Sequence, residues 1–142
     1  MQNNNADIYA ENILEHYRNP HHKEDMKNPT VEHEEANHAC GDIISVQIKL
    51  KDGGIEKIGW SGTGCAISQA GMSILSDELI GMKTEDVLKL KKNDVHIMLG
   101  IPIGPRRYKC ALLCLHTVKN ALRKTEELEP QGWLDTVEID EE

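Results

Sequence analysis

Three cysteines occupy the same kind of position in this sequence, at the boundary of a predicted helix or strand. Cys40 comes directly before a segment with strand periodicity, in ACGD, and Asp42 follows it two residues later. Cys65 lies at the glycine-rich start of a predicted helix, in GTGCAIS, and Cys110 lies in the first turn of the last helix, in GPRRYKCALLC. A cysteine that only fills a core usually lies within an apolar stripe, so this placement favours a chemical role.

The positions of Cys65 and Cys110 suit thiolates. A helix N-terminus lowers the pKa of a thiol, because its free N–H groups and the helix dipole stabilise the charged form. The basic run at 106–109 adds positive charge beside Cys110. If the loops converge, three thiolates and Asp42 form a pocket that could hold zinc tetrahedrally or iron in a cluster. The cysteine spacing matches no CxxC zinc finger, so only the fold could bring them together.

Composition and charge limit the classes of protein to which the chain can belong. Its 142 residues suit one domain, which we assign to 1–127, followed by an acidic, loosely held tail at 128–142. The net charge of −8 argues against a nucleic-acid partner. The N-terminus does not resemble a signal peptide, and no segment is long enough to span a membrane. We therefore expect a cytoplasmic protein, in which the cysteines favour metal or thiol chemistry over disulfides.

Hydrophobic periodicity predicts the elements that must position these residues. Strands are predicted at 30–35, 43–51 and 55–60, with a tight turn at 52–54 between the last two. Helices are predicted at 6–18, 66–80, 84–90 and 106–127. In the first helix, the apolar residues that fall near one face are Ile8, Ile13, Leu14 and Tyr17. The order of elements favours an α+β fold, with a small antiparallel sheet of about three strands and helices packed on one face.

Three motifs occur in order around the cysteines: ACGD, then GTGCAISQA after a hairpin, then KCALLCLHTVKNAL at the start of a C-terminal helix. Together they strongly resemble the U-type iron–sulfur cluster assembly scaffolds, which are IscU, SufU and the N-terminal domain of NifU. The resemblance runs from ILEHYRNP to about residue 125 and implies an IscU-like fold.

The resemblance also implies what the site holds. Cys40, Asp42, Cys65 and Cys110 would bind a zinc ion or a nascent, transient [2Fe–2S] cluster, and the three cysteines would be the candidate sulfur acceptors. The sulfur would come from a pyridoxal-phosphate cysteine desulfurase, and the cluster would pass to apo iron–sulfur proteins. The chain would then be a platform rather than an enzyme. Asp42, a harder and weaker ligand than a thiolate, would keep the cluster transferable.

Lys109 leaves the branch of the family open. The IscU branch usually has histidine directly before the third cysteine, and lysine there is similar to SufU, yet the chain lacks the insertion that SufU proteins carry. Besides the scaffold, a zinc-dependent sulfurtransferase that relays persulfide and a structural zinc module that mediates protein contacts are both compatible with the sequence. A homo-oligomer is compatible with it as well.

Several neighbouring residues need their own interpretation. Cys114, four residues after Cys110, is expected to fill the core, and the alternative is a spare ligand or resolving thiol. His38, two residues before Cys40, could lie near the metal. His116 is expected at the surface or in a satisfied core position, and the charged run 32–35 in an exposed strand or loop.

Overall fold

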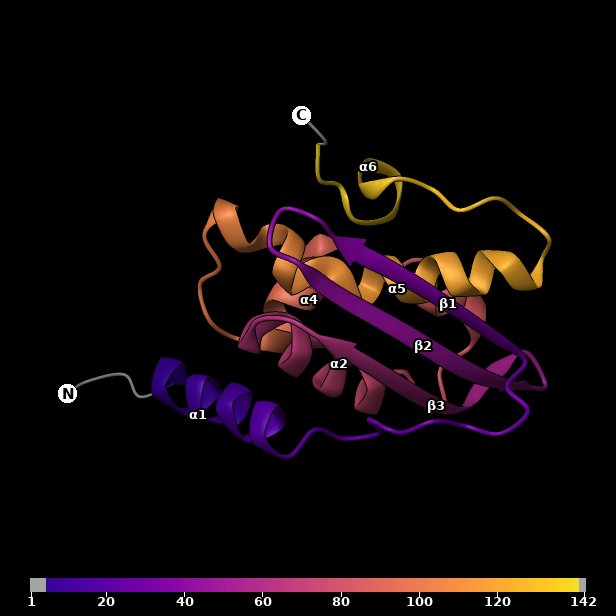
Figure 1. Cartoon of the computed structure of the whole chain (residues 1–142), viewed down its shortest axis with the longest axis horizontal. Coiled ribbons are helices and arrows are strands. Elements are labelled where there is room, and N and C mark those ends of the chain that lie inside the picture. Colours follow the sequence, from indigo (N-terminus) through magenta and orange to yellow (C-terminus); the bar gives the residue numbers. More distant parts are fainter. Residues whose placement is uncertain (1–4, 141–142) are drawn as a thin grey trace.

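A three-stranded antiparallel sheet organises the computed structural model, which describes residues 5–140. The strands are β1 (Val31–Asn37), β2 (Asp42–Lys51) and β3 (Gly54–Thr63), in the order β1-β2-β3 (Figure 1). Two hairpins connect them, with Asn37 opposite Asp42 in the first and Lys51 opposite Gly54 in the second. The predicted fold class is confirmed. Residues 1–4 and 141–142, which belong to the predicted domain and tail, lie outside the described residues.

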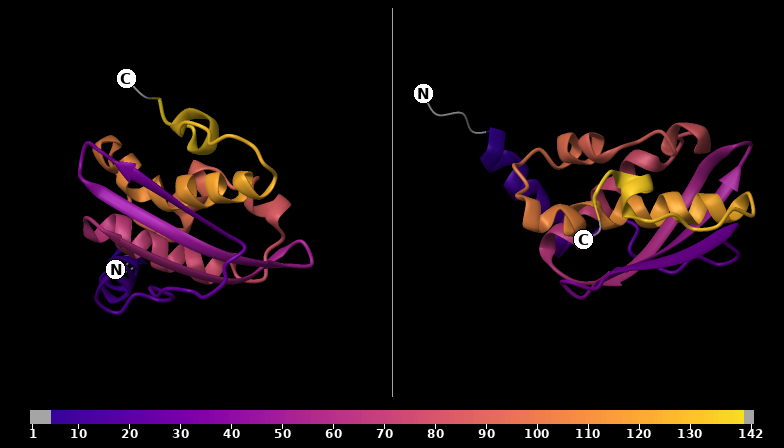
Figure 2. Two further views of the ribbon diagram at one scale, coloured as in Figure 1. Left: turned by 45° about the vertical axis from the view of Figure 1, so that its right-hand side comes forward. Right: turned by 90° about the horizontal axis from the view of Figure 1, so that it is seen from above.

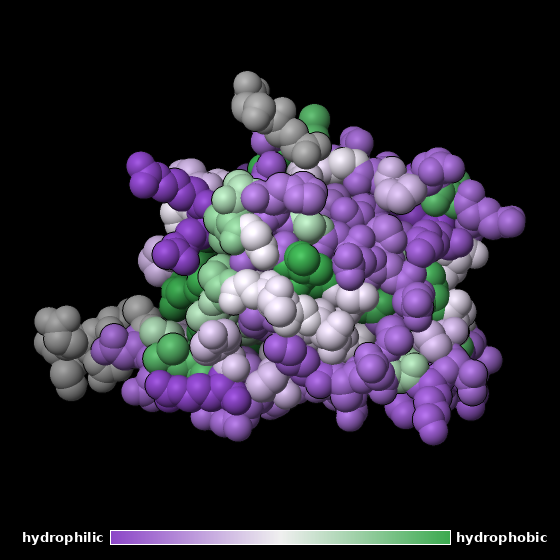
Figure 3. Space-filling view, in the orientation of Figure 1, coloured by the Kyte–Doolittle hydropathy of each residue, from purple (hydrophilic) through white to green (hydrophobic). Residues whose placement is uncertain are grey.

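Helices pack on one face of the sheet, as predicted. The main contacts with the sheet come from α2 (Ala66–Leu79) and α5 (Tyr108–Thr125). The other helices are α1 (Asn5–Arg18), α3 (Thr84–Val87), α4 (Lys92–Leu99), the 3-10 helix η1 (Pro105–Arg107) and α6 (Trp133–Val137). Figure 2 shows α2 and α5 on the same side of the sheet, and Figure 3 shows that the opposite side is mostly hydrophilic. Within residues 5–140, no helix is both long enough and apolar enough to cross a membrane.

The core lies between the sheet and the two long helices α2 and α5. Ile44, Val46 and Ile48 alternate along β2 on the side of these helices and are fully buried. Trp60 of β3 is also buried, and its Nε1–H donates to the carbonyl oxygen of His21 at 2.8 Å. The apolar stripe of β2 therefore points at α2 and α5, whose N-terminal ends carry the other two cysteines of interest.

The buried face of α1 is narrower than the sequence predicts. Of the four apolar residues that fall near one face, only Ile13 is buried, whereas Ile8, Leu14 and Tyr17 are exposed. The helix packs against α2 through Ile13 and His16, which are three residues apart. A short helix that contacts one neighbour needs only such a stripe, so much of its apolar surface stays in solvent.

The hydrophobic pattern of the sequence does not predict α4. Only Val95 and Leu99 of this helix are buried, and one pair of apolar residues gives little periodicity to detect. Gly100 ends α4 with a φ of 72°. The helix predicted at 84–90 is shorter than expected and ends at Val87.

The C-terminal segment packs against α5, so the prediction of a loosely held tail is wrong for residues 133–137. Trp133 and Val137 are buried, and the Trp133 ring stacks on His116 with the ring centroids 4.2 Å apart. Lys119 Nζ donates a hydrogen bond to the carbonyl oxygen of Thr136 at 2.8 Å. The acidic composition of the tail does not predict that these two apolar residues are buried.

Candidate metal centre

The turn between β1 and β2 presents Cys40. The backbone N–H groups of Cys40 and Gly41 both donate to the carbonyl oxygen of Asn37, at 3.3 and 2.9 Å. Gly41 has a φ of 73°, a conformation that favours glycine, so this turn depends on the glycine that follows the cysteine. Cys40 is exposed in the turn, while Asp42 begins β2 and is buried.

The Asp42 carboxylate is held by three hydrogen bonds. Asp42 continues the inward-facing stripe of Ile44 and is 0% exposed. Its Oδ1 accepts from the backbone N–H of Cys65 at 2.9 Å and from Ser68 Oγ at 3.4 Å. Its Oδ2 accepts from Asn37 Nδ2 at 3.3 Å. A buried carboxylate with these partners has a fixed orientation.

Gly64 allows this carboxylate to approach the start of α2. Cys65 is the N-cap residue of α2, and its own side chain makes no capping hydrogen bond. Gly64 has a φ of 146°, and a Cβ added there would overlap both Asp42 Oδ1 and Ser68 Oγ. The glycine-rich approach to the helix therefore serves close packing against Asp42 as well as the turn itself.

Cys110 reaches the same place from the first turn of α5. Its side chain is 3% exposed, and its Sγ lies 3.7 Å from the Sγ of Cys40. Asn37 Nδ2 lies 3.8 Å from the same sulfur. A turn and a strand that adjoin in the sequence thus meet a helix residue that is 70 positions away from Cys40.

Three of the four predicted ligands form one compact group. The sulfur atoms of Cys40 and Cys110 and a carboxylate oxygen of Asp42 all lie within 4.8 Å of one another. Cys65 borders this group through its backbone bond to Asp42, but its sulfur is not one of the atoms within that limit. The four-ligand set therefore stays a prediction. To complete it, the sulfur of Cys65 would have to move toward the other three ligand atoms.

The environment of Cys110 opposes the ionisation expected at a helix N-terminus. Burial raises the pKa of its thiol, and the neighbouring Asp42, Cys40 and Cys65 raise it further. The basic run does not reverse this, since Arg106 and Arg107 are exposed and Lys109 Nζ lies 5.3 Å from the Trp133 ring centroid. The helix dipole contributes about 0.3–1 kcal/mol, less than the cost of burying a thiolate without a partner.

The donor atoms nevertheless fit a soft metal ion. Thiolates and a carboxylate are ligands of zinc and of iron, and a bound cation would favour the deprotonated form of a buried thiol. Asn37 Oδ1 is buried and has no hydrogen-bond partner among the described residues, which leaves one further oxygen unsatisfied at the site.

Asn37 and Ser68 are the residues that the sequence analysis missed. Asn37 is 2% exposed and donates to both Asp42 and Cys110, so it links the carboxylate to a thiol. Ser68 is three residues after Cys65 in the first turn of α2 and touches Asp42 from the other side. The role of Asn37 follows from the strand register, which places it opposite Asp42. That register is known only once the strands are paired.

The other residues singled out near the site differ in burial. Cys114 is buried in the core and donates to the carbonyl oxygen of Ala111 at 3.4 Å, so the expected core role is confirmed. His116 is also a satisfied core residue, with its Nδ1 2.7 Å from Thr136 Oγ1. His38 is exposed. The charged run 32–35 lies in β1, but Glu35 is half-buried rather than exposed, which corrects that expectation.

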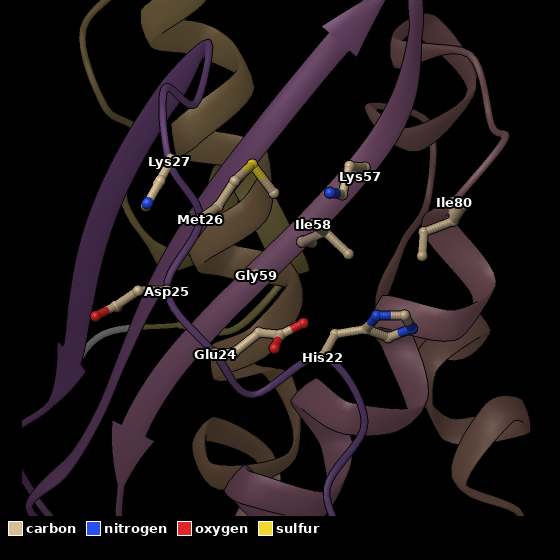
Figure 4. Close-up of a pocket in the computed structure, with 9 residues that line it drawn as sticks. All are labelled: His22, Glu24, Asp25, Met26, Lys27, Lys57, Ile58, Gly59 and Ile80. Atoms are coloured by element: carbon tan, nitrogen blue, oxygen red, sulfur yellow. The ribbon is translucent and has the colours of Figure 1, made fainter.

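A separate cavity of about 490 Å³ lies away from the cysteines (Figure 4). It is formed by the connector between α1 and β1 (residues 19–30), by β3 and by the end of α2. His22, Glu24 and Lys57 contribute polar groups to it. Its lining contains no thiol. The cavity is therefore distinct from the candidate metal centre.

Comparison with known proteins gives these motifs a context. The family model described as the NifU-like N terminal domain matches residues 8–129, which include all four predicted ligands. The chain belongs to this family. The family match also covers the turn, strand and helix starts that form the site, so the resemblance noted from the motifs is confirmed.

Individual members of the family are about equally similar to the chain. It is 31% identical over 133 residues to the iron–sulfur cluster assembly scaffold protein IscU of Thermotoga maritima, covering 82% of this chain and 94% of that protein. It is 28% identical to the zinc-dependent sulfurtransferase SufU of Bacillus subtilis, covering 84% of this chain and 92% of that protein.

A solved structure has the same fold. It is described as a putative iron–sulfur cluster assembly scaffold protein for the SUF system from Fervidobacterium islandicum AW-1. It superimposes with a TM-score of 0.70 at 27% identity, covering 82% of this chain and 97% of that one.

Proposed function

We propose that this protein is an iron–sulfur cluster assembly scaffold. In this role it accepts sulfur from a cysteine desulfurase, binds iron or zinc through Cys40, Asp42, Cys65 and Cys110, and passes a [2Fe–2S] cluster to apo-proteins. The observation that carries the proposal is the approach of Cys40 Sγ to within 3.7 Å of Cys110 Sγ, beside the buried Asp42 carboxylate. Relatives named as scaffolds and as a sulfurtransferase support the same pathway.

Cys40 is the best candidate for the first sulfur acceptor. It is exposed in a turn, whereas Cys65 is half-buried and Cys110 is buried. Its thiolate would attack the outer sulfur of a persulfide on the desulfurase. A new sulfur–sulfur bond forms on Cys40, the sulfur–sulfur bond of the desulfurase persulfide breaks, and the desulfurase cysteine leaves as a thiolate. The exposed position allows this in-line approach without opening the core.

Each of the other groups has a separate task. Cys110 and Cys65 supply thiolates for the iron that the cluster needs, and Asp42 supplies a weaker oxygen ligand that lets the cluster leave. Asn37 and Ser68 orient the Asp42 carboxylate through the bonds at 3.3 and 3.4 Å. A zinc ion bound at the same residues would stabilise the thiolates as a Lewis acid.

A zinc-dependent sulfurtransferase is the second candidate. Lys109 before the third cysteine favours it, as does the similarity to SufU of Bacillus subtilis. In this function Cys40 would carry persulfide to a further acceptor, and no cluster would form on the protein. The exposed thiol is required in both functions, so its exposure does not decide between them.

One anaerobic experiment separates the two functions. The pure protein is incubated with ferrous iron, cysteine and a cysteine desulfurase while absorption, metal content and sulfide content are measured. The scaffold is supported by a [2Fe–2S] spectrum that passes to an apo-ferredoxin. Persulfide on Cys40 with zinc retained and no chromophore supports the sulfurtransferase. If neither species forms, both functions are wrong and a structural zinc module is left.

A further inference from the structure

A second group of metal-binding side chains lies at the other end of α2. Asp77 is twelve residues after Cys65, so the two positions are about 18 Å apart along the helix axis. His16 of α1 and His21 of the connector meet Asp77 there. One ring nitrogen from each histidine and one carboxylate oxygen all lie within 4.8 Å of one another.

The contacts within this group are short and involve a third histidine. His21 Nδ1 lies 2.6 Å from Asp77 Oδ2, and His22 Nε2 lies 2.9 Å from Asp77 Oδ1. The His16 and His21 rings are 4.4 Å apart at their centroids. Figure 4 shows the His22 ring directed from the connector toward α2. Asp77 is thus contacted by two imidazoles of the connector, and a third imidazole, from α1, lies against the His21 ring.

Ser73 orients two of these residues. Its buried hydroxyl lies 2.7 Å from His16 Nδ1, and it accepts the backbone N–H of His21 at 2.7 Å. With Nδ1 of His16 turned to Ser73, Nε2 is the nitrogen left for a ligand, as in metal sites where the second ring nitrogen is hydrogen-bonded. His16 is 8% exposed, so its ring is held in place where α1 packs against α2.

We propose that His16, His21 and Asp77 form a second metal site, with His22 as a candidate fourth ligand, for a divalent transition-metal ion such as Zn²⁺. Imidazole and carboxylate together suit zinc and its neighbours in the first transition row, whereas Mg²⁺ and Ca²⁺ prefer oxygen alone. This site contains no thiol, so it differs in chemistry from the cysteine pocket. It does not depend on the proposed function.

A bound ion would link α1 and the connector to α2. The connector already bonds to β3, where the backbone N–H of Trp60 donates to the carbonyl oxygen of His22 at 3.1 Å and its ring N–H donates to that of His21 at 2.8 Å. Ligands from α1, the connector and α2 would therefore join three segments around one ion. Binding to the folded state alone raises Tm in proportion to the logarithm of ion concentration.

The test is a Co²⁺ titration of the full-length protein without a histidine tag, since a tag would bind the ion itself. Cobalt bound to thiolates gives intense sulfur-to-metal charge transfer, and cobalt bound to imidazole and carboxylate gives only weak d–d absorption. We expect one equivalent of Co²⁺ without charge transfer. His21→Ala and Asp77→Asn, both at exposed positions, should each weaken that equivalent by at least about tenfold and leave any charge-transfer band unchanged.

His38→Ala is the matched control, because it removes an exposed histidine outside the group. It should leave the equivalent without charge transfer unchanged. Addition of Zn²⁺ in excess of the cysteine pocket should raise Tm in the parent and in His38→Ala but not in Asp77→Asn. The proposal is overturned if the parent binds no ion without charge transfer, if that ion persists in both His21→Ala and Asp77→Asn, or if His38→Ala abolishes it.

Discussion

Two carboxylates on neighbouring strands, Glu35 and Asp42, face the helices, but the side chains that contact them differ in kind. Glu35 of β1 pairs with Ile44, so it shares the inner side of the sheet with Asp42 of β2. Glu35 Oε2 lies 2.6 Å from His33 Nε2 and 3.0 Å from Asn120 Nδ2, and its Oε1 lies 3.4 Å from His116 Nε2.

The side chains that contact Glu35 are hydrogen-bonded, whereas Asp42 lies beside free thiols. His116 also contacts Thr136 and stacks on Trp133. The side chains around Glu35 therefore hold the C-terminal segment against α5 and β1. Beside Asp42, the thiols of Cys40 and Cys110 lie 3.7 Å apart and form no disulfide. Satisfied polar clusters fix a structure, while a carboxylate among free thiols keeps donor atoms available for a ligand. The difference separates a structural from a chemical use of the same group.

The largest effect is expected at Cys110. Cys110→Ala removes a sulfur from the compact group, and the affinity for Zn²⁺ should fall by about 100-fold or more because a direct ligand is lost. Competition with a chromophoric chelator measures this affinity. Cys114→Ala makes the same chemical change one helical turn later in the core and should leave the affinity unchanged. Equal losses in the two variants would contradict the separation of site and core.

His116→Ala should act on stability instead. It removes the partner of Glu35 and Thr136 and the ring on which Trp133 stacks, so the free energy of unfolding should fall by about 2–4 kcal/mol. Denaturant unfolding measures the change. The affinity of the metal-free protein for Zn²⁺ should stay within about threefold of the parent. A loss comparable to that of Cys110→Ala would mean that the two regions are coupled.

Much of the Asp42 region could be predicted because its signals are local. Alternation along β2 places Ile44 and Val46 inward, and Asp42 continues that pattern two residues earlier. Glycines on either side of the site indicate tight turns. The predicted helix starts place Cys65 and Cys110 at the N-terminal ends of α2 and α5. Burial of Cys110 was not predictable in this way, since it depends on how α5 packs.

The Glu35 region could not be predicted because its partners are remote. Within the sequence, Glu35 ends a charged run, and such runs are usually solvated. Its burial results from α5, which brings Asn120 and His116 to β1, and from a tail whose Trp133 covers His116. No periodicity reports contacts over that distance, so both the half-buried glutamate and the packed tail escaped the sequence analysis.

Acid should weaken the Glu35 region selectively. Burial alone would raise the pKa of Glu35, but hydrogen bonds from His116, His33 and Asn120 outweigh it and lower the pKa from 4.5 to about 2. Because the folded-state pKa is the lower one, this stabilisation is complete above about pH 5 and is lost as the pH falls toward 2. Parent and Glu35→Gln should differ by about 1–2 kcal/mol at pH 6, allowing for solvent screening.

Unfolding free energies measured between pH 6 and pH 3 provide the test. The difference between the parent and Glu35→Gln should shrink with falling pH, because the unfolded-state carboxyl, whose pKa is 4.5, takes up a proton before the folded-state carboxyl does. Asp135→Asn, an exposed carboxylate on α6, is a suitable control and should show no comparable convergence. A constant difference for Glu35→Gln over this range would show that charge is not what stabilises the cluster.

The smallest effect, a change in cluster lifetime, is expected at Asp42. If this carboxylate is the weak ligand, Asp42→Ala should extend the lifetime of a reconstituted [2Fe–2S] cluster by about 3–10-fold, equivalent to about 1 kcal/mol. Decay of the visible absorption under anaerobic conditions measures it, with and without an apo-ferredoxin. Asp42→Asn keeps an oxygen that can accept the Cys65 N–H, so it separates the ligand charge from the support that Asp42 gives to α2. If both variants lost the cluster faster than the parent, Asp42 would stabilise the cluster rather than help to release it. Asp42 and Glu35 would then both have a stabilising role.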